Sequence, residues 1–186
     1  MSGAQACVVL LRGVNLGGRN VLPMADLRNA LSAAGLHDVR TYIQTGNIVC
    51  TAVDGASPDS IGRLVHSVLR QQFSLSVPLI VVPRAELQAA VSAMPFRGAA
   101  PTSVHVIMHA QPAEAENALT RALAFATPAT AHDQAVRSGR VIYLHTPHGF
   151  ARSKLAADIL RFGNGTARNL GTVSTLLHMC DDVQVA

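Results

Sequence analysis

Apolar residues along the chain follow two spacings, and each spacing predicts one kind of element. Short runs rich in Val and Leu, or strict alternation of polar and apolar side chains, are typical of strands. Apolar positions three and four residues apart are typical of helices that cover a core with one face. In the first half of the chain these patterns predict strands at residues 6–12, 39–44, 47–53 and 79–82. They predict helices that begin at Pro23 and at Pro58, where proline suits the first helical turn.

The order of these elements is β-α-β-β-α-β, which is the order of a ferredoxin-like unit. A helix over 84–94 and a proline-containing linker over 95–101 follow, and the order then begins again. In the second half we predict strands at residues 103–109, 130–137 and 140–144. We predict helices there at residues 112–125, 153–162 and 168–179. We therefore expect an α+β protein of two ferredoxin-like (α/β plait) halves, with antiparallel sheets and helices packed on one face. The halves are expected at residues 1–96 and 97–186, the second with an extra C-terminal helix.

Composition narrows the class of protein. Hydrophobic residues make up 49% of the 186 residues, which excludes a disordered chain. The three cysteines have no disulfide or zinc-binding spacing. His105 and His109 share one face of a predicted strand, but they stand about 13 Å apart, too far to share one metal ion. We expect no metal and no cofactor. Because neither an export signal nor a membrane span is recognisable, we expect a cytoplasmic protein with no membrane partner.

The net charge permits an anionic partner. The formal net charge is +4, and the 15 basic residues include a single lysine, Lys154. Aromatic residues are only 4% of the chain and Trp is absent, so few side chains are available to stack on bases. The composition therefore permits an acidic ligand or nucleic acid as partner, and the scarcity of aromatic residues disfavours nucleic acid without excluding it.

A segment rich in Gly and Asn lies between the first predicted strand and the first predicted helix. Segments at this position can hold phosphate, because backbone N–H groups and a helix N-terminus converge there. The glycine spacing fits neither the GxGxxG fingerprint nor the P-loop, and the alternative is a turn whose Asn side chains cap the backbone. The candidate ligand-binding residues of this segment are Arg12, Asn15, Gly17, Gly18, Arg19 and Asn20.

The turn between the second and third predicted strands carries two further candidates, Gln44 and Asn47. Their amides can hold a polar ligand only if this turn faces the first segment. A tight turn explains the same residues by backbone geometry alone.

Cations stand at two predicted helix starts in the second half. Arg152 and Lys154 flank Ser153, which is a good N-cap residue, and Arg168 and Asn169 open the predicted last helix. A positive side chain at a helix N-terminus opposes the helix dipole by about 0.3–1 kcal/mol, and a bound anion would relieve that conflict. The alternative is a solvated basic surface that binds nothing.

At these segments the sequence resembles a known family. LLRGVNLGGRNVLPM (10–24) and DVRTYIQTGNIV (38–49) are similar to the opening of the bacterial family called domain of unknown function 1697. GFARSKL (149–155) and TARN (166–169) resemble its C-terminal motifs. The resemblance implies two intertwined ferredoxin-like halves and no assigned activity. This chain has Leu170-Gly171 where the family usually has Trp-Asn, which removes an aromatic platform and an amide beside the candidate site.

These observations favour a binding module over an enzyme. We expect the candidate residues to hold a small anion, a nucleotide or a phosphorylated metabolite, in a cleft between the two halves. One alternative is an enzyme that acts on such an anion through Lys154 or Ser153, although no general base stands within the motifs. Nucleic-acid binding is the other alternative, and it rests on the net charge.

Overall fold

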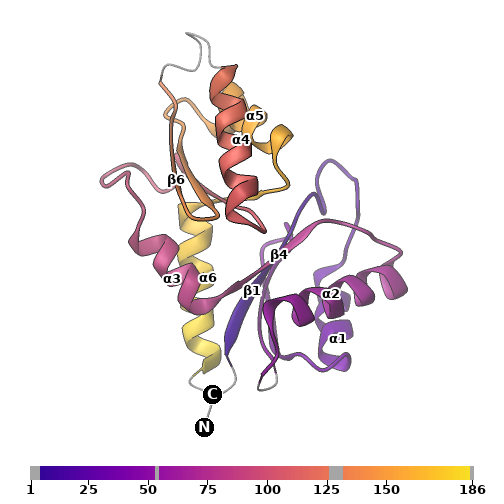
Figure 1. Cartoon of the computed structure of the whole chain (residues 1–186). Helices are drawn as coiled ribbons and strands as arrows, with labels where there is room; N and C mark the ends of the chain where they lie inside the picture. The colour runs from indigo at the N-terminus through magenta and orange to yellow at the C-terminus, as the bar shows by residue number, and fades with distance from the viewer. Residues whose placement is uncertain (1–4, 53–54, 126–131, 185–186) are drawn as a thin grey trace. The chain divides into compact units, whose positions relative to one another are not determined.

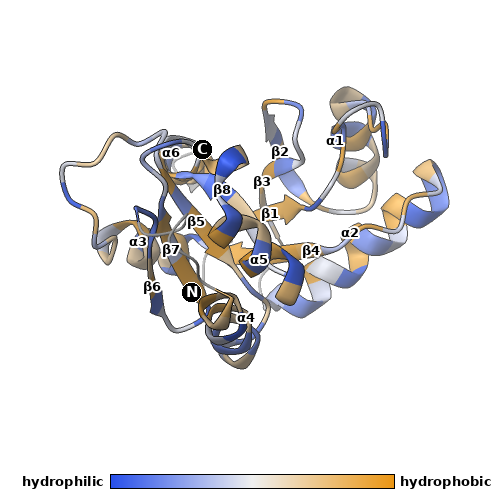
Figure 2. Cartoon of the chain, turned by 90° about the horizontal axis from the view of Figure 1, so that it is seen from above, coloured by the Kyte–Doolittle hydropathy of each residue, from blue (hydrophilic) through white to orange (hydrophobic). Residues whose placement is uncertain are grey.

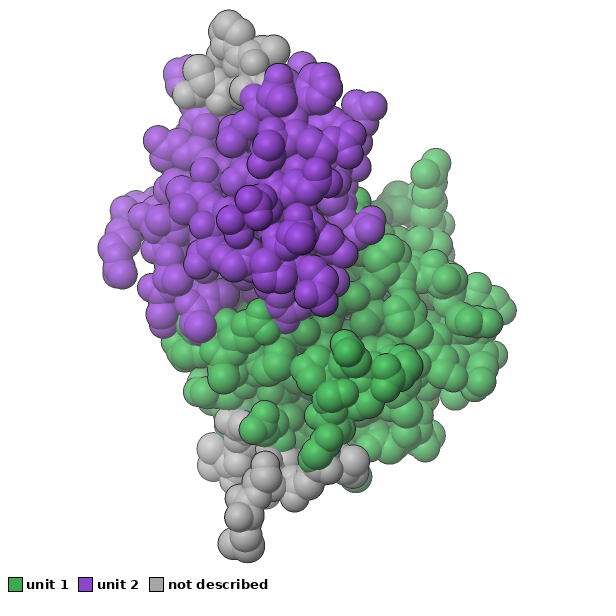
Figure 3. Space-filling view, in the orientation of Figure 1, with its two compact units in different colours: residues 1–88, 175–186 green, residues 89–174 purple. Residues whose placement is uncertain are grey.

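The structure is a computed structural model that describes residues 5–52, 55–125 and 132–184. The chain forms two compact units: unit 1 holds residues 1–88 with 175–186, and unit 2 holds residues 89–174 (Figure 3). The chain passes from unit 1 to unit 2 within helix α3 (Arg84–Ser92) and returns within the last helix, α6 (Leu170–Gln184).

This division differs from the expected halves in two places: unit 2 begins at residue 89, within α3, and α6 from Thr175 onward belongs to unit 1. Two aspartates of α6 lie near arginines of unit 1. Asp181 Oδ1 is 2.6 Å from Arg84 Nη2, and Asp182 Oδ2 is 4.0 Å from Arg40 Nη1. The chain end is thus tied to the unit in which the chain begins.

Unit 1 contains one four-stranded antiparallel sheet (Figure 1). Its strands lie in the order β2-β3-β1-β4, and their bounds are β1 (Ala6–Leu11), β2 (His37–Tyr42), β3 (Asn47–Thr51) and β4 (Leu79–Pro83). Helix α1 (Met24–Ala33) joins β1 to β2, and α2 (Pro58–Phe73) joins β3 to β4. Ser57 caps α2, because its side chain accepts a hydrogen bond from Ser60 N–H at 3.1 Å.

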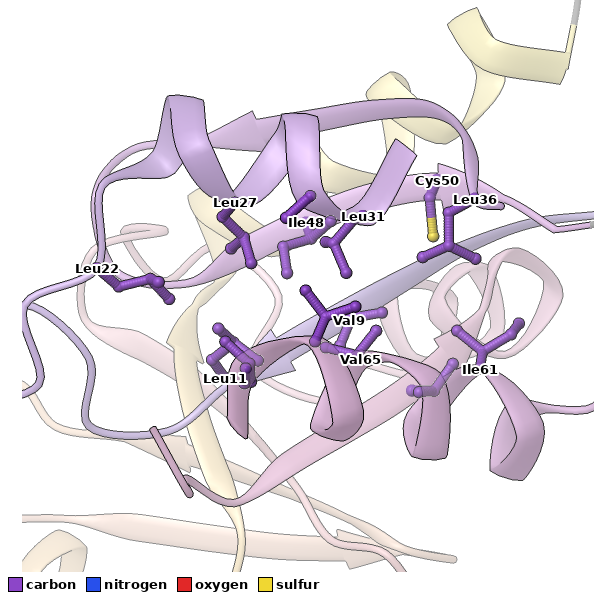
Figure 4. Close-up of a cluster of buried hydrophobic side chains, with 14 of the residues drawn as sticks. Val9, Leu11, Leu22, Leu27, Leu31, Leu36, Ile48, Cys50, Ile61 and Val65 are labelled. Atoms are coloured by element: carbon purple, nitrogen blue, oxygen red, sulfur yellow. The ribbon is translucent and has the colours of Figure 1, made fainter. Parts of the chain in front are cut away.

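The core of unit 1 lies between α1, α2 and one face of the sheet. Val9 and Leu11 of β1 are fully buried against Leu27 of α1 and Val65 of α2 (Figure 4). Helix α2 turns its hydrophobic residues inward and its hydrophilic residues outward, as the hydropathy colouring shows (Figure 2). Spacing of three and four residues produces this one-sided burial, as the sequence predicts.

Cys7 and Cys50 lie opposite one another in this core, on β1 and β3. Both thiols are buried, and their Sγ atoms are 3.6 Å apart. The hydrogen bond that Cys50 shares with Cys7, together with burial, raises the pKa of the Cys50 thiol. These side chains therefore pack as small hydrophobic groups.

Unit 2 repeats the topology. Its sheet has the order β6-β7-β5-β8, with β5 (Val104–Met108), β6 (Gln134–Ser138), β7 (Val141–His145) and β8 (Thr166–Asn169). Helices α4 (Pro112–Ala124) and α5 (Lys154–Phe162) enclose a second core, and a 3-10 turn, η2 (Phe150–Arg152), precedes α5. The predicted α+β fold with two ferredoxin-like antiparallel sheets is confirmed. Residues 53, 130 and 131 of the predicted strands lie outside the described residues.

One predicted element is wrong. The sequence pattern starts the last helix at residue 168, whereas residues 166–169 form β8 and α6 begins at Leu170. Strand β8 is too short to show a periodic pattern. It exists because it pairs with β5, with Val106 opposite Arg168. None of the helices in the described parts of the chain is long and apolar enough to cross a membrane.

Candidate functional site

The glycine-rich segment after β1 forms a small hairpin. Arg19 N–H donates to the Leu16 carbonyl at 3.0 Å. The two residues between them, Gly17 and Gly18, have φ angles of +56° and +74°. Positive φ at both central residues is the geometry of a type I′ turn, which glycine adopts without steric cost. The turn itself therefore accounts for both glycines.

Asn15 joins this hairpin to the turn between β2 and β3. Its Nδ2 donates to the carbonyl oxygens of Leu22 at 2.9 Å and Gln44 at 2.8 Å. Its Oδ1 accepts a hydrogen bond from Leu22 N–H at 2.8 Å. The two segments therefore lie side by side, which is the condition under which Gln44 and Asn47 can act together with the hairpin.

Gly46 forms a second connection between the two segments. Its carbonyl accepts a hydrogen bond from Leu11 N–H at 2.8 Å, and its φ is +77°. A Cβ atom at Gly46 would lie 2.6 Å from Leu11 Cβ and 2.7 Å from Val14 Cγ2. The turn packs so closely on the end of β1 that it leaves no room for a side chain.

The amides of Asn20 and Asn47 also hold the backbone. Asn20 Nδ2 donates to the Gly13 carbonyl at 2.8 Å. Asn47 is fully buried, and its Nδ2 donates to the Tyr42 carbonyl and to Thr45 Oγ1, both at 3.1 Å. These bonds match the alternative interpretation of the sequence, in which Asn side chains cap the backbone.

We call residues 12–23 and 42–47 together the loop platform. Arg19 and Gln44 are exposed on it, and Arg12 is half-buried. Three large apolar residues are also exposed, Leu16 at 56%, Val21 at 67% and Ile43 at 50%. The two ranges contain no Asp or Glu. The platform thus presents positive charge, an amide and apolar surface.

Ile43 is held in the left-handed region of the backbone, with a φ of +49°. This conformation costs an L-residue about 1–2 kcal/mol and is uncommon for a β-branched side chain. The carbonyls on both sides of Ile43 are held by asparagines, that of Tyr42 by Asn47 and that of Gln44 by Asn15. The surrounding hydrogen bonds therefore maintain the strain.

In unit 2 the N-terminus of α5 has its own carboxylate. Ser153 Oγ accepts a hydrogen bond from Ala156 N–H at 2.9 Å and donates to Asp133 Oδ2 at 2.7 Å. Asp133 lies 20 residues earlier in the chain, outside the motif. The negative charge of Asp133 offsets the positive end of the helix dipole. The sequence alone suggests that a bound anion offsets it. Arg152 and Lys154 are exposed, and the described residues supply neither of them with an ion-pair partner.

Arg168 does not stand at a helix N-terminus, and this correction follows from β8. Its Nη1 donates to Thr166 Oγ1 and to the Ala167 carbonyl, both at 2.8 Å. Burial lowers the pKa of Arg168 to about 10. Asn169 is the N-cap of α6, because its Oδ1 accepts a hydrogen bond from Thr172 N–H at 2.7 Å. Both side chains therefore form hydrogen bonds to residues one to three positions away in the sequence.

Sequence reasoning missed the packing role of His109, which is fully buried at the end of β5. A Cβ atom would lie 2.7 Å from His109 Nε2 at Gly163, and 2.6 Å from it at Gly165. The loop between α5 and β8 therefore needs glycine at both positions. Two glycines separated by one residue, together with a histidine at a strand end, are the only signal of this contact in the sequence.

Sequence reasoning also missed a hollow on the outer face of α2. Its volume is about 390 Å³, and it is lined by Arg63, His66, Ser67, Arg70 and Gln71. These residues lie on the face of α2 that is opposite its apolar stripe. The helical spacing of polar residues in the sequence therefore indicates this face. Within the described residues, no group of three His, Cys, Asp or Glu side chains is placed to hold a metal ion.

Comparisons with known proteins agree with this architecture. The model of a protein family of unknown function (DUF1697) matches residues 5–143. A search of curated proteins finds no match. A solved structure of a conserved bacterial protein from Streptococcus pneumoniae is similar, with a TM-score of 0.77 and 17% sequence identity, over 96% of this chain and 99% of that chain. At this identity the likeness concerns the fold alone.

Proposed function

This chain belongs to the DUF1697 family of proteins of unknown function, and we propose that it binds a small organic anion on the loop platform of unit 1. A nucleotide or a phosphorylated metabolite has the matching chemistry, because it joins phosphate groups to a less polar body. Arg12 and Arg19 supply the positive charge, Gln44 supplies an amide, and the exposed apolar residues supply contact for the body of the ligand.

The observation that carries this proposal is the strained backbone of Ile43. A large apolar side chain that is half exposed contributes little to the core, and its left-handed φ costs about 1–2 kcal/mol. Strained residues persist where the surrounding structure holds them, and they cluster at binding sites. Asn15 and Asn47 hold this turn and are positioning residues. In this proposal the exposed side chains of Ile43, Arg19 and Gln44 touch the ligand.

Binding is favoured over catalysis because the candidate nucleophile is already used. Ser153 Oγ accepts the first-turn N–H of α5 and donates to Asp133, so its hydroxyl serves as a helix cap. The loop platform contains no Asp, Glu or His to act as a general base.

Calorimetric titration of the full chain with inorganic phosphate and with adenosine monophosphate tests the proposal. Arg19→Ala should weaken binding by about tenfold or more, because a hydrogen bond to a charged group contributes about 1.5–3 kcal/mol. Arg63→Ala on the outer face of α2 removes the same charge elsewhere in unit 1 and should leave the affinity unchanged. Equal losses in both variants, or no binding by the native chain, would contradict a site on the platform.

Ile43→Gly separates binding from stability. Glycine relieves the left-handed strain, so the variant should unfold at a higher denaturant concentration, with about 1 kcal/mol of added stability. The same variant should bind adenosine monophosphate more weakly, because it loses the apolar contact. A variant that gains stability and keeps full affinity would remove Ile43 from the site.

A further inference from the structure

A second set of side chains with binding chemistry lies where α4 and α5 end, in unit 2. The rings of Phe125 and Phe162 are stacked, with centroids 5.5 Å apart and an interplanar angle of 27°. Arg121 Cζ lies 4.3 Å from the Phe162 ring centroid, and Arg161 Cζ lies 5.4 Å from it. Arg121, Arg161 and Phe162 lie in the last turns of α4 and α5, and Phe125 directly follows α4. We call these four residues the Phe-Arg cluster, and the two helices pack side by side (Figure 1).

The outer part of the cluster is open. Phe125 is 58% exposed, which is the second largest exposure among the large hydrophobic residues that the structure describes. The chain has only seven Phe and Tyr residues and no Trp, so two rings in one stack are a large share of its aromatic surface. A ring with one covered face and one open face can extend its stack with any planar aromatic ligand.

The charge of the cluster is positive after the helix dipoles are counted. Two helix C-termini contribute about −0.5 each, and the two arginines contribute +2, which leaves about +1. Neither arginine has an ion pair with a carboxylate from the described parts of the chain. A guanidinium that lies over a ring keeps its N–H groups free at its edge, where they can reach phosphate oxygens.

We propose that the Phe-Arg cluster binds single-stranded nucleic acid, with a base stacked on Phe125 and the neighbouring phosphates held by Arg121 and Arg161. Stacking explains the open ring, and phosphate contacts explain the two arginines without carboxylates. A duplex hides the faces of its bases, so a single strand fits the open ring better. This site is separate from the loop platform and does not depend on the function proposed there.

Fluorescence anisotropy with a labelled oligo(dT) of about 12 nucleotides tests this proposal on the full chain. Phe125→Ala should weaken binding by at least about fivefold, since one stacked base contributes about 1–3 kcal/mol. Phe125→Tyr keeps the ring and should bind like the native chain. Arg121→Ala together with Arg161→Ala should reduce the slope of log K against log salt by about 1.4, because each phosphate contact on a single strand contributes about 0.7.

Two matched variants control for general effects. Leu123→Ala removes an exposed apolar side chain of the same helix, which is 49% exposed, and should leave the affinity unchanged. Arg63→Ala with Arg70→Ala removes two charges from the hollow on α2 and should leave the affinity unchanged as well. Thermal melting of each variant checks that it is folded.

The proposal is overturned if the native chain does not bind the oligonucleotide, or if the control variants weaken binding as much as Phe125→Ala. It is also overturned if sedimentation shows that Phe125→Ala dissociates a dimer while oligonucleotide affinity stays unchanged, because the ring would then be a contact between copies. Phosphate titration of the Arg19→Ala variant reports separately on the loop platform, so failure of one site is distinguishable from failure of the other.

Discussion

Units 1 and 2 share one sheet topology and differ in the connections that extend it. Unit 1 inserts the hairpin of residues 12–23 between its first strand and first helix, whereas unit 2 joins β5 to α4 through residues 109–111 alone. Unit 2 instead places the 3-10 turn η2 between its third strand and second helix. The two units therefore share one sheet topology but differ in their connections, and connections are the parts of a fold that most often carry binding residues.

The two units also use polar side chains in different ways. In unit 1, Asn15 joins two loops through a hydrogen bond from its amide to the Gln44 carbonyl, and the buried Asn47 holds one of these loops through the Tyr42 carbonyl. In unit 2, His109 fills the space that side chains at Gly163 and Gly165 would need. Unit 1 thus fixes its exposed loops by hydrogen bonds, and unit 2 fixes a loop by packing. Substitutions that disturb the loops of unit 1 or the packed loop of unit 2 test this difference.

The largest effect is expected for Gly46→Ala in unit 1. The new Cβ would meet Leu11 Cβ at 2.6 Å, and φ at this position is +77°. Steric overlap and left-handed strain together should lower the free energy of unfolding by about 3 kcal/mol or more. Gly17→Ala has a φ of +56° but no atom within 4 Å, so it should lose only about 1 kcal/mol. Similar losses in urea denaturation would show that the close packing is not what the turn requires.

The next effect is expected for Gly165→Ala in unit 2. Its Cβ would lie 2.6 Å from His109 Nε2 and 2.9 Å from Ile107 Cγ2, and the overlap should cost about 2 kcal/mol. His109→Ala removes the imidazole, so the double variant should be less destabilised than the sum of the single variants by about 1 kcal/mol or more. Additive losses in thermal unfolding would mean that His109 does not occupy the space beside this glycine.

An intermediate effect is expected on acidification of unit 2. His105 stacks on Phe150 at 3.9 Å between ring centroids, and burial lowers the pKa of His105 to about 4. Below its ordinary pKa of 6.5 the unfolded chain takes up a proton that the folded chain refuses, so stability falls as the pH drops from 6.5 towards 4. With allowance for solvent screening this loss is about 1–2 kcal/mol.

His105→Gln is the control for this pH dependence. The variant removes the titrating ring, so the difference in unfolding free energy between native chain and variant should shrink as the pH is lowered from 7 to 4. Urea denaturation at several pH values measures this difference. A constant difference across the range would show that His105 does not contribute to acid sensitivity.

The smallest effect is expected for Lys154→Ala. The ammonium group opposes the dipole of α5, so its removal should raise stability by a few tenths of a kcal/mol. Asp133→Ala removes the carboxylate that accepts a hydrogen bond from Ser153, so it should lower the free energy of unfolding. The two variants should therefore change stability in opposite directions. If Lys154→Ala instead reduces affinity for adenosine monophosphate tenfold, the lysine contacts the ligand. A loss of folding would assign it a structural role.

The boundaries of most elements follow from local patterns. Proline at the start of α2, the serine cap before it and the apolar stripe along it are all readable in the sequence, because each depends on residues within a few positions. Strand β8 is not readable in this way. Its four residues have no period of their own, and only the hydrogen bonds that β5 supplies make them a strand.

The same distinction between local patterns and long-range contacts applies to the candidate site. Local patterns in the sequence are enough to place the candidate residues in loops, to predict a turn at Gly17 and Gly18, and to show that the α5 N-terminus needs a negative charge. The folded chain adds two contacts that these patterns do not contain: Asn15 joins the two loops of unit 1, and Asp133 supplies the charge at Ser153. The physical reason is range: turn and cap preferences act between near neighbours, whereas these contacts join residues 29 and 20 positions apart, and the fold alone brings them together.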